Sequence, residues 1–232
     1  MARRTRNPRD RSFGKVTVVK ITHYLYILSS WSFVAEDAMQ KVRARFATDL
    51  QYEWRIASTD YGGMGRLPRR DLEFYYARLE AATGRAMNLG WWRENYDWLV
   101  PDRTAVAARL LGATGSEVRL ALAAAGLERG ENITHRDTAI AIACSASGLQ
   151  PAALAAQFDH ASTHLAMYAE MQQFRASGVN LRPAFVLENE LGDIVALSGI
   201  WNVEPLESAV NALLTDEKSY KAFVVDHPVP RD

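Results

Sequence analysis

Ser29 and Ser32 stand where an apolar strand pattern changes into a helical one, and their type and spacing are the first in the chain to suggest chemistry. Residues 24–28 form the apolar run, and a helix-like pattern begins at Phe33. A hydroxyl at a helix start can cap the unpaired backbone N–H groups there. The same N–H groups and the helix dipole also favour a bound thiolate. We therefore interpret the two serines either as helix caps or as part of a site that stabilises a sulfur anion.

Other nucleophilic chemistry has little support in the sequence. A serine hydrolase needs a positioned base, normally a histidine oriented by a carboxylate, and the chain contains no Gly-x-Ser-x-Gly elbow. Cys144 is the single cysteine, so this chain cannot carry out dithiol–disulfide exchange by itself. It lies in the apolar helical run TAIAIACSASGL, where we expect a small core residue rather than a reactive thiol.

An aromatic segment at residues 89–102, LGWWRENYDWLVPD, is the second candidate for a site. It either packs the helices onto the sheet or forms the wall of a pocket for a flat, aromatic or apolar molecule. Two further tryptophans could line the same cleft, and Arg182 or Arg103 could bind an acidic group through a bidentate contact. The predicted substrate-binding residues are Trp31, Trp91, Trp92, Tyr96, Trp98, Trp201 and Arg103.

Several other polar residues are expected to have structural roles. Asp102 or Thr104 is predicted to cap a helix that reads TAVAARLLGAT. His160 and His164 have the i, i+4 spacing of two metal ligands on one helix face, but no third ligand accompanies them. We expect a solvated polar face there and no metal site.

The order of elements predicts an α/β fold. Residues 15–60 read strand–helix–strand, which is a parallel βαβ unit. Residues 61–177 are almost wholly helical, and residues 178–215 read as a hairpin followed by a helix. A thioredoxin-like half before and after a helical insertion should share one mixed sheet with a hairpin at its edge. Residues 1–14 are expected to form a flexible basic tail, and residues 216–232 a C-terminal tail.

Composition excludes several classes of function. Formal net charge is zero over 232 residues, which argues against nucleic acid as the main partner. No apolar run approaches the roughly 18 residues of a membrane span, and no export signal follows the basic N-terminus. We therefore expect a cytoplasmic protein with a small-molecule substrate.

Three segments together resemble the DsbA-like branch of the thioredoxin superfamily. SSWS stands where thiol oxidoreductases of the family have a Cys-Pro-Trp-Cys-like motif, and GVNLRPAFVLEN is similar to the family's segment with a cis-proline before a core strand. The run from RGENITHRDTAIAIACSASGL to SGIWNVEPLESAV follows its last helices and closing hairpin. The resemblance covers about residues 16–214. It is strongest to the subgroup of kappa-class glutathione transferases and 2-hydroxychromene-2-carboxylate isomerases, whose motif is Ser-Pro-Tyr-Ser-like.

This resemblance implies roles for particular residues. Ser29, with Ser32 nearby, would hold the thiolate of glutathione or of another low-molecular-weight thiol. Pro183 is the cis-proline candidate, and the backbone of Arg182 before it would bind the extended thiol. Asn202 is the polar residue near the position where the subgroup binds the glutamyl end of glutathione. The implied activity is isomerisation of, or transfer to, an aromatic or unsaturated acid, in a protein that can be a homodimer.

Two departures from the subgroup keep alternatives open. Ser30 replaces the proline that follows the first motif position, and GIWNVEPLE lacks the subgroup's Asp-Arg-like pair. Another thiol could therefore replace glutathione. The chain could also be a redox-silent module that binds a small molecule or peptide, or a cofactor-free isomerase or lyase that uses the aromatic pocket directly.

Overall fold

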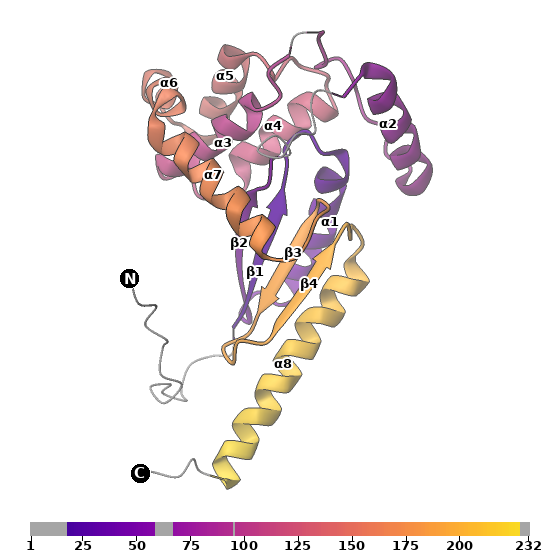
Figure 1. The fold of residues 1–232 in the computed structure, drawn as a ribbon, viewed down its shortest axis with the longest axis vertical. Coiled ribbons are helices and arrows are strands. Elements are labelled where there is room, and N and C mark those ends of the chain that lie inside the picture. The colour runs from indigo at the N-terminus through magenta and orange to yellow at the C-terminus, as the bar shows by residue number, and fades with distance from the viewer. Residues whose placement is uncertain (1–17, 59–66, 95, 228–232) are drawn as a thin grey trace.

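A mixed four-stranded sheet with the order β2-β1-β3-β4 is the centre of the molecule (Figure 1). β1 (Val19–Leu25) pairs in parallel with β2 (Leu50–Ile56) and antiparallel with β3 (Ala184–Glu188). β4 (Ile194–Ser198) pairs antiparallel with β3 and forms one edge, and β2 forms the other. The computed structural model describes residues 18–58, 67–94 and 96–227. The predicted α/β fold, with a mixed sheet and a hairpin at its edge, is confirmed.

The two faces of the sheet bury different residues of β1. Val19 and Ile21 are fully buried against α1 (Ser30–Arg45) and α8 (Val203–Asp226). Tyr24 points to the opposite face and packs with side chains of α7 (Ala161–Ala176). This division follows from the strand period of two, which sends successive side chains to opposite faces.

Helices inserted between β2 and β3 form a layer at one end of the sheet, with α2 at its side (Figure 1). Their packing with the ends of β1 and β2 makes one continuous apolar core. Glycines in the left-handed conformation end two of them, Gly84 at φ 71° and Gly148 at φ 73°, as expected for helix C-termini. The remaining helices are α2 (Arg69–Thr83), α3 (Val100–Leu110), α4 (Glu117–Leu127), α5 (Arg136–Ser147) and α6 (Pro151–Asp159).

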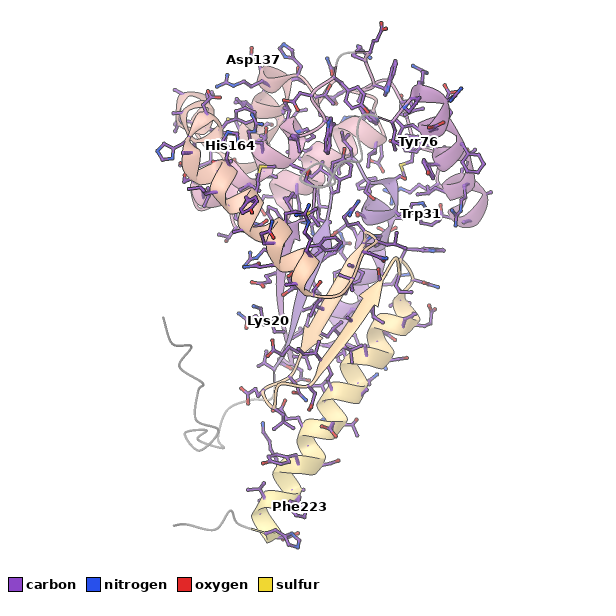
Figure 2. All side chains as sticks on the ribbon, viewed as in Figure 1. Lys20, Trp31, Tyr76, Asp137, His164 and Phe223 are labelled. Atoms are coloured by element: carbon purple, nitrogen blue, oxygen red, sulfur yellow. The ribbon has the colours of Figure 1, made fainter. Side chains whose placement is uncertain are left out.

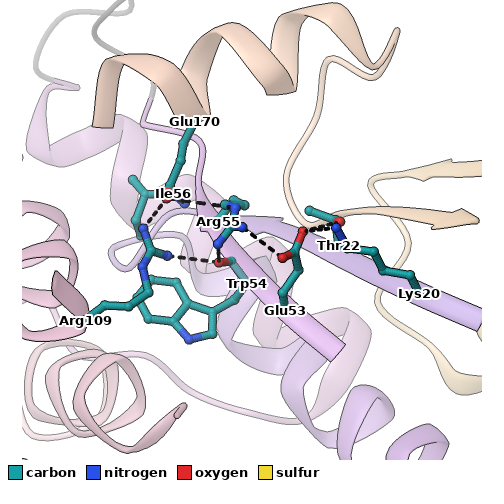
Figure 3. Close-up of polar contacts among 8 residues, drawn as sticks. All are labelled: Lys20, Thr22, Glu53, Trp54, Arg55, Ile56, Arg109 and Glu170. Carbon is teal, nitrogen blue, oxygen red and sulfur yellow. Dashed lines mark hydrogen bonds and ion pairs between the residues drawn. The ribbon is translucent and has the colours of Figure 1, made fainter. Parts of the chain in front are cut away.

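Glu170 on α7 forms polar contacts that connect this helical layer to β2 (Figure 3). Its Oε2 accepts the backbone N–H of Ile56 at 2.7 Å, and its Oε1 forms a short contact with the Arg109 guanidinium of α3. Arg109 also donates to the Trp54 carbonyl at 3.0 Å. One buried carboxylate therefore joins β2, α3 and α7.

Two local predictions are corrected by the structure. The expected C-terminal tail from residue 216 begins inside α8, which continues to Asp226. Glu217 is fully buried there, and an ion pair of 2.7 Å with Lys221 one turn later stabilises this part of the helix. The predicted cap of α3 is also wrong, because Leu99 is the N-cap and both Asp102 and Thr104 lie inside the helix.

Candidate functional site

Ser29 is the N-cap of α1. Its backbone is extended, at φ −80° and ψ 109°, and its Oγ accepts the backbone N–H of Ser32 at 3.2 Å. No acidic side chain lies in the first turn of α1, so nothing there offsets the positive end of the helix dipole. Because Oγ acts as the acceptor in this cap, the hydroxyl proton remains available to donate to a ligand.

Ser32 has a different environment from Ser29. Its side chain is buried, and its Oγ has no hydrogen-bond partner among the described residues. It does not line the cavity next to Ser29. Its contribution to the site is its backbone N–H, which holds the Ser29 hydroxyl in place.

A cavity of about 280 Å³ opens at Ser29. Figure 2 shows two residues of its walls on the same side of the molecule, Tyr76 on α2 and Trp31 at the start of α1. The sheet side contributes Leu181 and Arg182, which precede β3. The full lining is Tyr26, Leu28, Ser29, Ser30, Trp31, Leu67, Leu72, Tyr75, Tyr76, Trp91, Tyr96, Trp98, Leu181 and Arg182.

Aromatic side chains that contact one another form much of the cavity wall. The indole N–H of Trp91 donates to the Tyr76 hydroxyl at 3.2 Å, and Tyr96 meets the Trp91 ring edge-on with 5.5 Å between ring centroids. Tyr26 and Trp98 meet in the same way at 6.0 Å. Most of these rings are buried by their neighbours, so a ligand would meet fixed faces and edges suited to a flat apolar group.

Among the described lining residues, the cationic one is Arg182. Its guanidinium carbon lies 5.5 Å from the centre of the Phe174 ring. No ion pair to it occurs within the described ranges of the chain. Burial lowers the pKa of Arg182, while the neighbouring Asp102 and Tyr26 act in the opposite direction, and a guanidinium remains charged. The Arg182–Pro183 bond is cis, which confirms the cis-proline prediction.

Asp102, on α3, lies fully buried close to this cavity. Its Oδ1 accepts the backbone N–H of Ile27 at 3.0 Å, whereas Oδ2 has no hydrogen-bond partner among the described residues. Burial raises the pKa of the Asp102 carboxyl to about 8, against the opposing effects of the Ile27 N–H, Arg182 and the Ser58 hydroxyl. Sequence reasoning missed this residue because an aspartate near a helix start looks like an ordinary cap.

The other predicted site residues lie outside the cavity lining. Trp201 packs on Trp31 with ring centroids 6.0 Å apart, and Asn202 is the N-cap of α8. Trp92 packs on Tyr96 at 6.1 Å, behind the aromatic wall. The lining residues that the sequence did not suggest are Tyr26, Leu28, Ser30, Leu67, Leu72, Tyr75, Tyr76 and Leu181. Apart from Ser30, they are apolar or tyrosine side chains, which carry no local sequence signal for a site.

Arg103 and Cys144 also lie elsewhere. The Arg103 guanidinium is 4.9 Å from the centre of the Phe158 ring, away from the cavity lining. Cys144 is half-buried on α5, and burial raises the pKa of its thiol. His160 caps α7 by accepting the Ser162 N–H. Within the described residues, no three histidine, cysteine or acidic side chains are grouped to hold a metal ion.

None of the helices in the described ranges has the length and apolar character needed to cross a bilayer. No family model and no curated protein matches the sequence. Solved structures do match. A candidate protein disulfide isomerase from Nitrosomonas europaea has a TM-score of 0.73 at 16% identity, over 86% of this chain and 98% of the other.

Two more structures extend the match. The cytosolic disulfide reductase DsbM from Pseudomonas aeruginosa has a TM-score of 0.65 at 18% identity, over 87% of this chain and 99% of its own. A 2-hydroxychromene-2-carboxylate isomerase has a TM-score of 0.61 at 14% identity, over 87% of this chain and 98% of its own. The fold is DsbA-like. The predicted thioredoxin-like fold with a large helical insertion is therefore confirmed, and at these identities the match concerns the fold alone.

Proposed function

We propose that this protein is a thiol-dependent isomerase or transferase that acts on an aromatic or unsaturated acid and takes no part in disulfide exchange. The observation that carries the proposal is the position of Ser29, which combines a helix N-terminus, a hydroxyl proton free to donate and a wall of the aromatic cavity. A structure of Pseudomonas aeruginosa DsbM with GSH shares the fold at a TM-score of 0.60, which makes glutathione the first thiol to test.

The residues at the start of α1 fit a thiolate. The Ser29 hydroxyl can donate to it, and the unpaired N–H groups of the first helical turn add positive potential. A bound thiol would supply a nucleophilic sulfur that adds to an electrophilic carbon and then leaves, giving isomerisation, or stays, giving transfer. The chain's own Cys144 cannot take this part, because it lies outside the cavity.

The remainder of the cavity would bind the acid. The aromatic wall offers rigid ring faces and edges to a flat carbon skeleton, and Arg182 offers a guanidinium to its carboxylate. Arg182 and Ser29 line the same cavity, so the acid and the thiol can meet there. We assign Pro183 and Asn202 no contact in this arrangement, because neither lines the cavity.

Thermal melting with glutathione tests the thiol site. Glutathione at about 100 times its dissociation constant should stabilise the protein by about 2.7 kcal/mol, a rise in melting temperature on the order of 5–10 °C. Ser29→Gly removes the hydroxyl but lowers the free energy of unfolding by only a few tenths of a kcal/mol, because glycine is an acceptable N-cap. The melting temperature without glutathione should therefore change little, and the rise with glutathione should be lost.

His160→Ala is the matched control, because it removes an N-cap from α7 and leaves the cavity intact. This variant should melt earlier but keep the full shift with glutathione. A shift that survives in Ser29→Gly would remove Ser29 from the thiol site. No shift with any thiol would favour a cofactor-free enzyme or a binding module.

A further inference from the structure

Asp102 is a fully buried carboxyl that does not line the cavity, although its hydrogen-bond partner Ile27 lies between two lining residues, Tyr26 and Leu28. We propose that Asp102 is a positioning residue that acts through Arg182. When protonated, it leaves the Arg182 cation available to a ligand carboxylate; when ionised, it neutralises that cation and weakens acidic ligands. This inference rests on the proposed function only in placing an acidic ligand in the cavity, and it does not require a thiol.

The hydrogen bonds of Asp102 favour its neutral form. A carboxylate buried in a protein normally has an ion pair or several hydrogen bonds, because desolvation of the charge is costly. Asp102 is fully buried with one hydrogen bond, from the Ile27 N–H to Oδ1. The nearby buried Ser58 hydroxyl favours the ionised form of Asp102, but it is a neutral group, and no ion pair to Asp102 occurs among the described residues. A protonated Asp102 is therefore the better match to its surroundings.

Charged and titratable groups approach Asp102 from three other elements. Arg182, before β3, favours the ionised form, and Glu170 on α7 opposes it. Tyr26 follows β1 and lines the cavity. Burial holds its pKa well above the usual value, so its hydroxyl stays neutral between pH 6.5 and 9.5. Arg103, on α3 itself, lies over the Phe158 ring. Among the described residues, Arg182 is thus a cation that both lines the cavity and acts on Asp102.

The consequence is a pH dependence with a definite sign. Below the pKa of Asp102, which is about 8, the cavity has the unbalanced charge of Arg182 and attracts an anion. Above it, the Asp102 carboxylate repels that anion. In general, two unit charges about 10 Å apart at an effective dielectric constant of about 20 interact strongly enough to change an equilibrium constant on the order of tenfold. Neutral ligands of the same shape should be unaffected.

Equilibrium binding of 2-naphthoate and of 2-naphthamide between pH 6.5 and 9.5 tests the proposal without any thiol. In the wild type, naphthoate affinity should fall about tenfold over this range while naphthamide affinity stays constant. Asp102→Asn keeps an oxygen that can accept the Ile27 N–H but cannot ionise, so its naphthoate affinity should be strong at every pH. Arg182→Met should bind naphthoate weakly at every pH, and any remaining fall in affinity should begin at a higher pH than in the wild type, because Asp102 loses the cation that favours its ionised form.

Three results would overturn the proposal: a wild-type naphthoate affinity that does not change with pH, an unchanged pH dependence in Asp102→Asn, and no naphthoate binding at pH 6.5. If Asp102→Asn does not fold, Asp102→Ser provides the same comparison with a smaller acceptor. Failure here with a normal glutathione shift would leave the thiol site of Ser29 intact. If the naphthoate results are as expected but glutathione gives no melting shift, the acid site stands without the thiol site.

Discussion

Ser29 and Ser32 are the same residue type three positions apart, yet their hydroxyls have different surroundings. Ser29 Oγ is a helix cap at the edge of a cavity, and Ser32 Oγ is buried without a partner in the described structure. Ser29 has an extended backbone before the helix begins, whereas Ser32 lies within the first turn, so the two side chains have different surroundings. The tetrapeptide therefore offers one hydroxyl to a ligand.

Ser32→Ala tests this difference. Alanine removes a buried hydroxyl that has no partner and is the better helix former, so the free energy of unfolding should stay constant or rise by up to about 1 kcal/mol. Ser29→Ala should lower it by about 1 kcal/mol through loss of the cap. Urea unfolding of both variants makes the comparison. A loss of more than about 1 kcal/mol in Ser32→Ala would show that its hydroxyl has an important partner.

The raised pKa of Asp102 makes the free energy of unfolding depend on pH. An unfolded aspartate has a pKa near 3.9, and the folded one has a pKa of about 8. Between these values the folded state binds more protons, so this residue's contribution is complete below about pH 4 and is lost as the pH rises to 8.

Asp102→Asn has no such titration. Its free energy of unfolding should therefore increase relative to wild type from pH 5 to pH 8, by at most about 1.4 kcal/mol per pH unit. Urea unfolding at pH 5, 6.5 and 8 measures the difference. A constant difference across these three values would mean that Asp102 is ionised throughout.

At the scale of elements, the helical layer is held on the sheet by a few directional contacts in addition to apolar packing. Glu170 binds the Ile56 N–H and the Arg109 guanidinium (Figure 3). Because β2 ends at Ile56, these contacts hold the end of that strand against α3 and α7.

Removal of the Glu170 carboxylate should be costly. Glu170→Ala leaves the buried Arg109 cation and the Ile56 N–H without this partner, and the loss of one member of a buried pair typically costs about 3–5 kcal/mol. Glu73→Ala is the matched control, because its ion pair with Arg69 at 2.9 Å lies on the surface of α2 and should contribute less than about 0.5 kcal/mol. Equal losses of unfolding free energy in the two variants would show that Glu170 contributes no more than a surface ion pair. Denaturant melts provide the measurement.

At the scale of the molecule, the sheet and the helical layer share one core. Leu25 and Ile56 from the strands belong to the same apolar cluster as Leu122 and Leu154 from the insertion. Trp54 joins the two parts again, because its indole N–H donates to the Gly115 carbonyl at 2.9 Å. The two parts should therefore unfold together, although the sequence divides them into separate blocks.

This cooperativity can be measured with two probes. Tryptophan fluorescence reports mainly on the cavity and the helical layer, and far-UV circular dichroism reports on all helices, including α8. The two urea transitions should coincide, as for a two-state protein. Transitions separated by more than the fitting error would show instead that the helical layer unfolds by itself.

The sequence by itself was enough to predict the order of elements, the mixed sheet, the cis bond before Pro183 and the position of Ser29 at a helix start. The order of elements and the position of Ser29 depend on local signals, namely strand and helix periodicity and the helix-start position. The cis bond before Pro183 was predicted from the resemblance of GVNLRPAFVLEN to the DsbA-like segment. Other local patterns led to wrong predictions. Asp102 looked like a cap, and the polar residues after 216 looked like a tail.

Only the tertiary structure decided which side chains form the cavity. Tyr76 and Trp91 meet there from separate segments, and Arg182 comes from another segment more than 80 residues farther along the chain. The structure also placed Arg103 over a remote phenylalanine and brought the buried Asp102 close to Arg182. The reason is physical: burial, charge proximity and the meeting of helix faces depend on how elements pack, and no pattern within one segment determines them.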